Sequence, residues 1–176
     1  MHNSGLFLAT LLALSQVQAA KPHALFVVGT HHYSPHETMP ALASQLDALG
    51  WKTSVLNPGY NPEKNIKGIA RLELLQEADV AIFYTRFLTL PPDQFRLIQL
   101  YLEAGKPVVG FRTSTHAFDY PKDNSLTKWN NGFGSDALGS QYFAHLQGDT
   151  SVTLSKGAGD HLILTGINLA EPIAAA

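Results

Sequence analysis

The chain has 176 residues, of which 45% are hydrophobic and 15% are charged, and its formal net charge at pH 7 is -2. This composition fits one domain with a buried core, and it excludes a chain that is disordered, collagen-like or coiled-coil throughout. Lysine and arginine are nowhere clustered, so we expect neither a nucleic-acid groove nor a basic membrane-binding face. Cysteine is absent, which excludes disulfides, zinc–thiolate sites and a cysteine nucleophile.

Residues 1–19 have the pattern of a signal peptide. Residues 6–14 (LFLATLLAL) form an apolar run that is too short to span a bilayer, which needs about 20 residues. Residues 17–19 (VQA) then provide small residues for cleavage after Ala19. Because no lysine or arginine precedes the run, a buried N-terminal helix is the alternative. We expect export to the periplasm or the extracellular space, leaving one domain over residues 20–176 without a membrane span.

From residue 21 onward, strand-like and helix-like segments alternate. Continuous apolar runs predict buried strands over residues 24–29, 53–56, 79–85 and 107–111. Apolar residues at helical spacing predict helices between them, over residues 35–49, 66–76 and 91–105, the first opening with a capping box at Ser34. Buried strands that alternate with helices predict a parallel sheet with right-handed crossovers.

The pattern changes after residue 112. Residues 113–135 are rich in polar and aromatic residues and predict a long functional loop. We expect a short helix over residues 136–143 and a late antiparallel strand over residues 152–154. Residues 168–176 have no periodicity, so we expect them to be exposed. The aromatic residues of this region could either meet the C–H faces of sugars or form a satellite core; they are Tyr120, Trp129, Phe133 and Tyr142.

Charged and titratable side chains follow three of the predicted strands, in residues 30–33 (THHY), 85–87 (TRF) and 112–116 (RTSTH). In an open parallel sheet, ligands bind outside the carboxyl ends of the strands. His116 could be a general base, a metal ligand or a donor to a sugar hydroxyl, and structural roles are the alternatives for each of these residues. We predict a cleft that is lined by His32, Arg86, Arg112, Thr113, His116 and Trp129.

Other kinds of site have weaker signals. Metal ligands could come from His32, His116, Asp119, His145, Asp160 and His161, but their spacing matches no known metal motif. The sequence therefore requires no cofactor, and a divalent metal stays an open alternative. Ser114 lacks the flanking glycines of a GxSxG nucleophile elbow. Residues 157–159 (GAG) lack the strand and helix of a nucleotide-binding loop, which disfavours nucleotide cofactors.

Several segments resemble known families. Residues 105–112 (GKPVVGFR), followed by His116, resemble the GKPVLGICxGHQ segment of class I glutamine amidotransferase-like domains. A closer resemblance, over residues 23–167, is to the trehalose-utilisation (ThuA-like) family, and within it to secreted planctomycete-type members. Its most specific segments are RTSTHAF and WNNGFG. The full set is residues 23–42 (HALFVVGTHHYSPHETMPAL), 85–87 (TRF), 112–118 (RTSTHAF), 129–134 (WNNGFG) and 160–167 (DHLILTGI).

The resemblance implies an α/β fold of the flavodoxin-like, class I glutamine amidotransferase-like kind, a three-layer sandwich with a mostly parallel sheet. We expect the strand order 2-1-3-4 plus a late edge strand. Arg112 stands where the amidotransferases have their nucleophilic cysteine, which excludes glutaminase chemistry by thiolate attack. Family members usually continue well past the DHLILTGI segment, so we expect a truncated or shortened version of the domain.

The resemblance also implies a role in the utilisation of trehalose-like or keto-disaccharides. In an enzyme, a hydrolase or lyase, His116 would be the acid/base and Arg112 would stabilise negative charge on oxygen. The alternative is a non-catalytic sugar-binding or assembly module, and homo-oligomers are compatible with either. The remaining contacts to a small-molecule carbohydrate are expected from His31, His32, Arg86, Thr113, Asp119 and Trp129.

Overall fold

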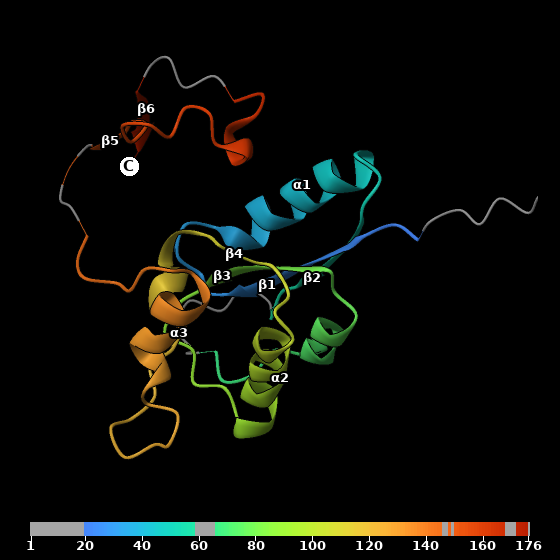
Figure 1. The fold of residues 1–176 in the computed structure, drawn as a ribbon. Helices are drawn as coiled ribbons and strands as arrows, with labels where there is room; N and C mark the ends of the chain where they lie inside the picture. Colours follow the sequence, from blue (N-terminus) through green and yellow to red (C-terminus); the bar gives the residue numbers. More distant parts are fainter. Residues whose placement is uncertain (1–19, 59–65, 146–147, 149, 168–171, 176) are drawn as a thin grey trace, which may run out of the picture. The chain divides into compact units, whose positions relative to one another are not determined.

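The computed structural model describes residues 20–58, 66–145, 148, 150–167 and 172–175. The predicted signal peptide, residues 1–19, lies outside these residues. The chain divides into two units, Met1–Gln141 and Tyr142–Ala176. The first unit contains a four-stranded sheet of order β2-β1-β3-β4, which confirms the predicted order (Figure 1). Its strands are β1 (His23–Gly29), β2 (Lys52–Leu56), β3 (Val80–Thr85) and β4 (Val108–Gly110), and every pairing is parallel.

The central strand β1 is buried along its whole length. Its register places Phe26 between Val55 of β2 and Ile82 of β3. Because alternate side chains of a strand point to opposite faces, Leu25 packs into one hydrophobic cluster and Phe26 into another. Fully burying one such side chain contributes about 1.5–3 kcal/mol. This double burial explains why the strand is a continuous apolar run rather than an alternating one.

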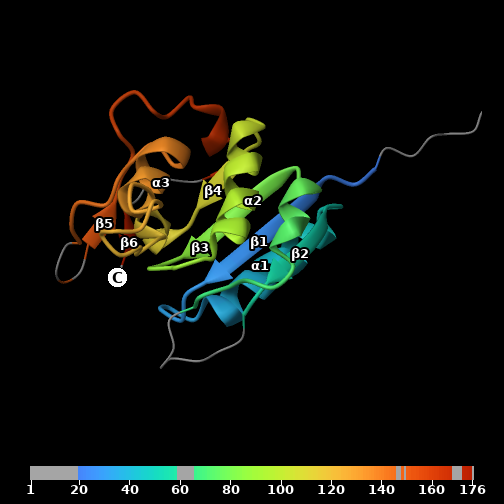
Figure 2. The same cartoon turned by 90° about the horizontal axis from the view of Figure 1, so that it is seen from below.

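Helices cover both faces of the sheet, which gives the predicted three-layer sandwich (Figures 1 and 2). Helix α1 (Pro35–Ala48) buries Met39 and Ala43 in the cluster that contains Phe26. Helix α2 (Pro92–Glu103) and the 3-10 helix η1 (Leu72–Gln76) bury their apolar side chains in the other cluster. The segments that follow β1, β3 and β4 lie at the carboxyl ends of these strands.

Two details of the predicted helices are wrong. Ser34 makes no side-chain cap, because its backbone has a φ of 52°, and its carbonyl instead accepts hydrogen bonds from the amides of Glu37 and Thr38. The helix predicted over residues 66–76 is only the 3-10 turn η1. Upstream of it, the amide of Ile69 donates to Oε1 of Gln94 at 2.8 Å, and Arg71 has a φ of 65°. Both features interrupt helical hydrogen bonding before residue 72.

The region after β4 contains more regular structure than the predicted loop. It opens with the 3-10 helix η2 (Arg112–His116) and continues to helix α3 (Trp129–Ala137). The helix expected over residues 136–143 therefore lies several residues earlier. Its position is set by close packing, because a Cβ added at Gly134 would lie 2.5 Å from the carbonyl oxygen of Thr115. Only glycine lets α3 approach the backbone of η2 this closely.

The second unit contains a small antiparallel sheet of β5 (Thr150–Val152) and β6 (Ile173–Ala175), with the 3-10 turn η3 (Leu162–Leu164) between them. The late antiparallel strand thus begins two residues earlier than predicted, and it pairs with β6 rather than with the four-stranded sheet. Strand β6 lies within residues 168–176 although the sequence has no periodicity there, and Pro172 and Ile173 are exposed as expected. Within the described residues, no helix has the length and apolar character that crossing a membrane requires.

Candidate functional site

The polar segments singled out in the sequence meet at the carboxyl edge of the four-stranded sheet. Arg86 directly follows β3, and Arg112 comes two residues after β4. Backbone hydrogen bonds join the segments: the amide of Arg86 donates to the carbonyl of Gly29 in β1, and the amide of Phe87 donates to the carbonyl of His116 in η2. We call the resulting group the strand-end cluster; its members are His32, Tyr33, Arg86, Phe87, Arg112 and His116.

A short hydrogen bond links two members of the strand-end cluster. Nη1 of Arg86 donates to Nε2 of His32 at 2.7 Å. Since a guanidinium can only donate, Nε2 must be the acceptor, so a neutral His32 carries its proton on Nδ1. Burial, and then the charges of Arg86 and the neighbouring His31, lower the pKa of His32. His32 is therefore a neutral imidazole at pH 7 that holds the Arg86 guanidinium in place.

Aromatic rings lie against both arginines. Cζ of Arg112 lies 3.7 Å from the ring centroid of Tyr33, and Cζ of Arg86 lies 4.2 Å from the ring centroid of Phe87. These are cation–π distances. The rings are also open to solvent, with Tyr33 58% and Phe87 41% exposed. The cluster therefore presents apolar ring surface and planar hydrogen-bond donors side by side.

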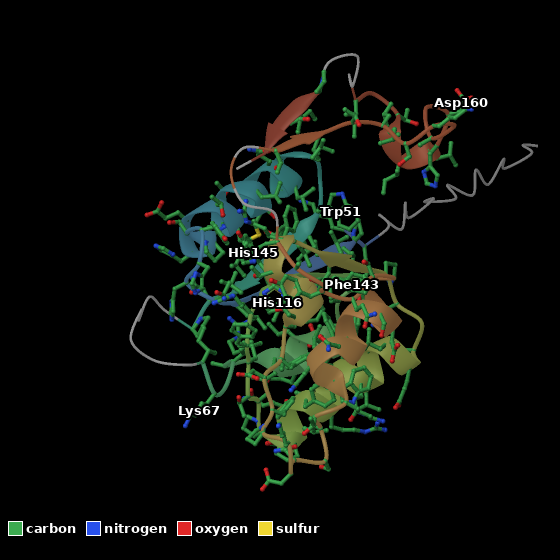
Figure 3. All side chains as sticks on the ribbon, turned by 90° about the vertical axis from the view of Figure 1, so that its left-hand side faces the viewer. Trp51, Lys67, His116, Phe143, His145 and Asp160 are labelled. Carbon is green, nitrogen blue, oxygen red and sulfur yellow. The ribbon has the colours of Figure 1, made fainter. Side chains whose placement is uncertain are left out.

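His116 belongs to the same group. Its ring centroid lies 5.2 Å from that of Phe87, with the two planes tilted by 52°. The side chain is half-buried and projects from the last residue of η2 (Figure 3). The contacts run without a break from His32 through Arg86 and Phe87 to His116. The structure thus brings together His32, Arg86 and His116, three of the residues that the sequence assigns to the cleft.

Backbone strain is concentrated at the strand-end cluster. Four of the five non-glycine residues with positive φ in the described part of the chain lie at this edge: Tyr33 (68°), Ser34 (52°), Phe87 (53°) and Arg112 (42°). Each such conformation costs on the order of 1–3 kcal/mol and persists only where surrounding structure enforces it. Strain of this kind gathers at ligand-binding and active sites, so its location favours this edge as the candidate site.

The hydroxyl groups of η2 hold the cluster in place rather than face a ligand. Oγ1 of Thr113 donates to the carbonyl of Thr85 at 2.9 Å. Oγ of the fully buried Ser114 lies 2.8 Å from the carbonyl of Phe83 and accepts from the amide of Thr85 at 3.1 Å. The predicted ligand contact Thr113 therefore lies in the wall behind the cluster. Ser114 is a positioning residue that sequence reasoning did not assign.

Trp129, another predicted contact, packs in the hydrophobic core of the first unit. The ring of Trp129 lies 5.2 Å from that of Phe95 of α2, and Tyr120 and Phe133 are buried in the same hydrophobic cluster. Trp129, Tyr120 and Phe133 therefore form the satellite core that was the alternative to contacts with a sugar. Asp119 is exposed, and its backbone pairs with Leu88. His31 is half-buried beside His32. Tyr142 lies in the second unit, where its hydroxyl is 3.0 Å from Nδ1 of His145.

The predicted metal ligands do not converge within the described residues, which hold no group of three histidine, aspartate or glutamate side chains suited to a metal ion. His32 is bonded to Arg86 instead. In the second unit, Nδ1 of His161 accepts a hydrogen bond from the amide of Ile163 at 3.2 Å.

Sequence reasoning missed two members of the strand-end cluster. Tyr33 and Phe87 are not among the predicted site residues, although each directly follows one of them, His32 or Arg86, in the segments THHY and TRF. Their signal was position, because each ring lies in a short polar segment that follows a buried strand.

Comparisons with family models, with curated proteins and with solved structures found no match to this chain.

Proposed function

We propose that this chain is an exported ThuA-like domain that acts on a trehalose-like or keto-disaccharide, which binds at the strand-end cluster. The observation that supports this best is the pairing of exposed rings with guanidinium groups. Tyr33 and Phe87 offer apolar faces for the C–H surfaces of a sugar, and Arg86 and Arg112 offer planar donors to hydroxyl, carbonyl or carboxylate oxygens. The RTSTHAF and WNNGFG segments supply the resemblance behind the family part of the proposal.

In the catalytic form of this proposal, His116 exchanges a proton with a hydroxyl or glycosidic oxygen of the sugar, as a general acid or base. Arg112 stabilises the negative charge that develops on an adjacent oxygen. The strained backbone of Arg112 and the ring contacts of both residues hold these groups before the substrate arrives. Such preorganisation is what electrostatic catalysis requires.

A second candidate is a binding module that holds the sugar without turnover. One observation favours it: the segment after β4 has Arg112 at its first position, and the hydroxyls of Thr113 and Ser114 are bonded to backbone carbonyls. The hydroxyls of Thr113 and Ser114 are therefore engaged with the backbone and do not serve as nucleophiles for covalent catalysis.

The test incubates the purified protein with trehalose and 3-keto-trehalose, with and without EDTA, and measures both turnover and binding heat. Turnover that is lost in His116→Ala and kept in His145→Ala, a matched histidine of the second unit, supports the enzyme. Binding without turnover supports the module. If neither sugar binds, the proposed function is wrong.

A further inference from the structure

The segments that form the strand-end cluster contain basic residues and no acidic ones. Residues 30–34, 86–87 and 112–116 contain two arginines and three histidines but no aspartate or glutamate. The acidic residues that follow the first and the last of these segments in the chain are Glu37, which lies 3.6 Å from His36 in α1, and Asp119, which is exposed. A site built for a neutral sugar normally balances its donors with carboxylate acceptors, and the segments of this site supply none.

The guanidinium of Arg86 lies beside an imidazole and an aromatic ring. Among the described residues Arg86 forms no ion pair, and its guanidinium contacts His32 and Phe87 instead. An imidazole accepts the hydrogen bond but does not neutralise the charge. After burial, the positive charge of Arg86 is the next cause of the lowered pKa of His32, because it opposes a second positive charge beside it. The guanidinium of Arg86 therefore carries a positive charge that no carboxylate of the described residues offsets.

The two arginines are held by neighbouring residues. Nη1 of Arg86 is 2.7 Å from the ring of His32, and Cζ of Arg112 is 3.7 Å from the ring of Tyr33. The His32–Tyr33 dipeptide thus contacts both guanidinium groups at once. Both charges stand at one edge of the sheet, and an exposed ring accompanies each of them.

We propose that the ligand of the strand-end cluster is an acidic carbohydrate, a sugar that carries a carboxylate. This inference rests on the sugar binding of the proposed function and adds a carboxylate to the sugar. The carboxylate accepts hydrogen bonds from the Arg86 guanidinium, whose planar fork matches a carboxylate in two-pronged geometry. The sugar ring lies against the exposed aromatic surface of Phe87 or Tyr33. His32 orients Arg86 by accepting from Nη1, so it is a positioning residue.

The test titrates the full chain with glucuronate, glucose and acetate by isothermal calorimetry, at low and at high salt. We expect glucuronate to bind about ten- to a hundredfold more tightly than glucose, because a charge-assisted hydrogen bond replaces a neutral one. Added salt should weaken glucuronate binding and leave glucose binding unchanged. Arg86→Gln should remove the preference, Arg86→Lys should keep part of it, and Arg96→Gln, an exposed arginine of α2, should keep all of it.

Each outcome separates this inference from the proposed function. If glucose and glucuronate bind equally, or if Arg86→Lys and Arg86→Gln both keep the full preference, the acidic-sugar inference is wrong and sugar binding stands. If acetate binds as tightly as glucuronate, the cluster is a plain anion site and the proposed carbohydrate function is wrong. If none of the three binds, the proposed function and this inference both fail. Circular dichroism of each variant confirms that a lost preference does not come from unfolding.

Discussion

At the scale of single residues, Ser114 joins the segment that carries Arg112 and His116 to the sheet. Its buried hydroxyl accepts a hydrogen bond from the amide of Thr85 and donates one to the carbonyl of Phe83. We expect Ser114→Ala to lower the free energy of unfolding by about 1–3 kcal/mol, because a buried amide would lose its acceptor. Urea unfolding measures the change, and Ser135→Ala, an exposed serine of α3, is the control. Equal stability of the two variants would contradict this role.

His23 gives the stability a pH dependence. It is 3% exposed at the start of β1, and its Nε2 lies 3.0 Å from Oγ of Ser54. Burial, and then the charge of Lys52, lower its pKa below the unfolded value of 6.5. Between the folded and the unfolded pKa, the unfolded chain binds more protons, so stability is full above pH 6.5 and is lost as the pH falls below it. Urea midpoints measured from pH 7.5 to 5 should therefore fall less steeply in His23→Gln; parallel curves for the two proteins would contradict the role of His23.

The sequence predicts the position of the titratable groups better than their orientation. The sequence indicates Arg86, Arg112 and His116 because polar residues in the segments that follow the strands lie at the carboxyl end of the sheet, where ligands bind. Thr113 and Ser114 share that position, but backbone carbonyls of β3 bind their hydroxyls. Such partners are distant in sequence and leave no local pattern.

At the scale of elements, local pattern predicted the strands and failed at α3. Strands β1 and β3 are continuous apolar runs because two helical layers bury them, whereas β2 and β4, at the two edges of the sheet, are less buried than predicted. Helix α3 contains Gly132 and Gly134, which disfavour a helix in isolation. Its stability comes instead from packing, with Phe133 fully buried and Gly134 against the backbone of Thr115. Tertiary contacts of this kind cannot be inferred from helical periodicity.

Replacing each of the two glycines of α3 by alanine should change the free energy of unfolding in opposite directions. In Gly134→Ala, the new Cβ would lie 2.5 Å from the carbonyl oxygen of Thr115 and 2.7 Å from that of Ser140, so α3 must shift from η2. We expect a loss of about 1–3 kcal/mol in the free energy of unfolding, together with weaker ligand binding at His116.

In Gly132→Ala, the nearest atoms lie 3.8 Å away, an ordinary contact. Replacing a glycine inside a helix by alanine then stabilises the protein by about 0.5–1 kcal/mol. Thermal and urea unfolding of the two variants check the signs. A stabilised Gly134→Ala would show that α3 does not depend on this close approach.

At the scale of the whole molecule, the two units differ in how they bury apolar surface. Every buried residue in the described chain lies between His23 and Gly134, inside the first unit. The described residues from 142 onward bury none, and Leu162 and Phe143 are 87% and 80% exposed. Because buried apolar area is the main source of stability, the first unit should fold without the second.

A chain that ends at Gln141 tests this directly. We expect it to unfold in one cooperative transition, with a melting temperature within about 4–8 °C of that of the full chain, which corresponds to a change of about 1 kcal/mol or less. It should also keep the sugar binding of the full chain, since the whole strand-end cluster lies before residue 117. Calorimetry of both chains and titration with the same ligand measure the two quantities. Loss of cooperative unfolding in the shorter chain would mean that the second unit completes the core, and loss of binding alone would mean that it contributes to the site.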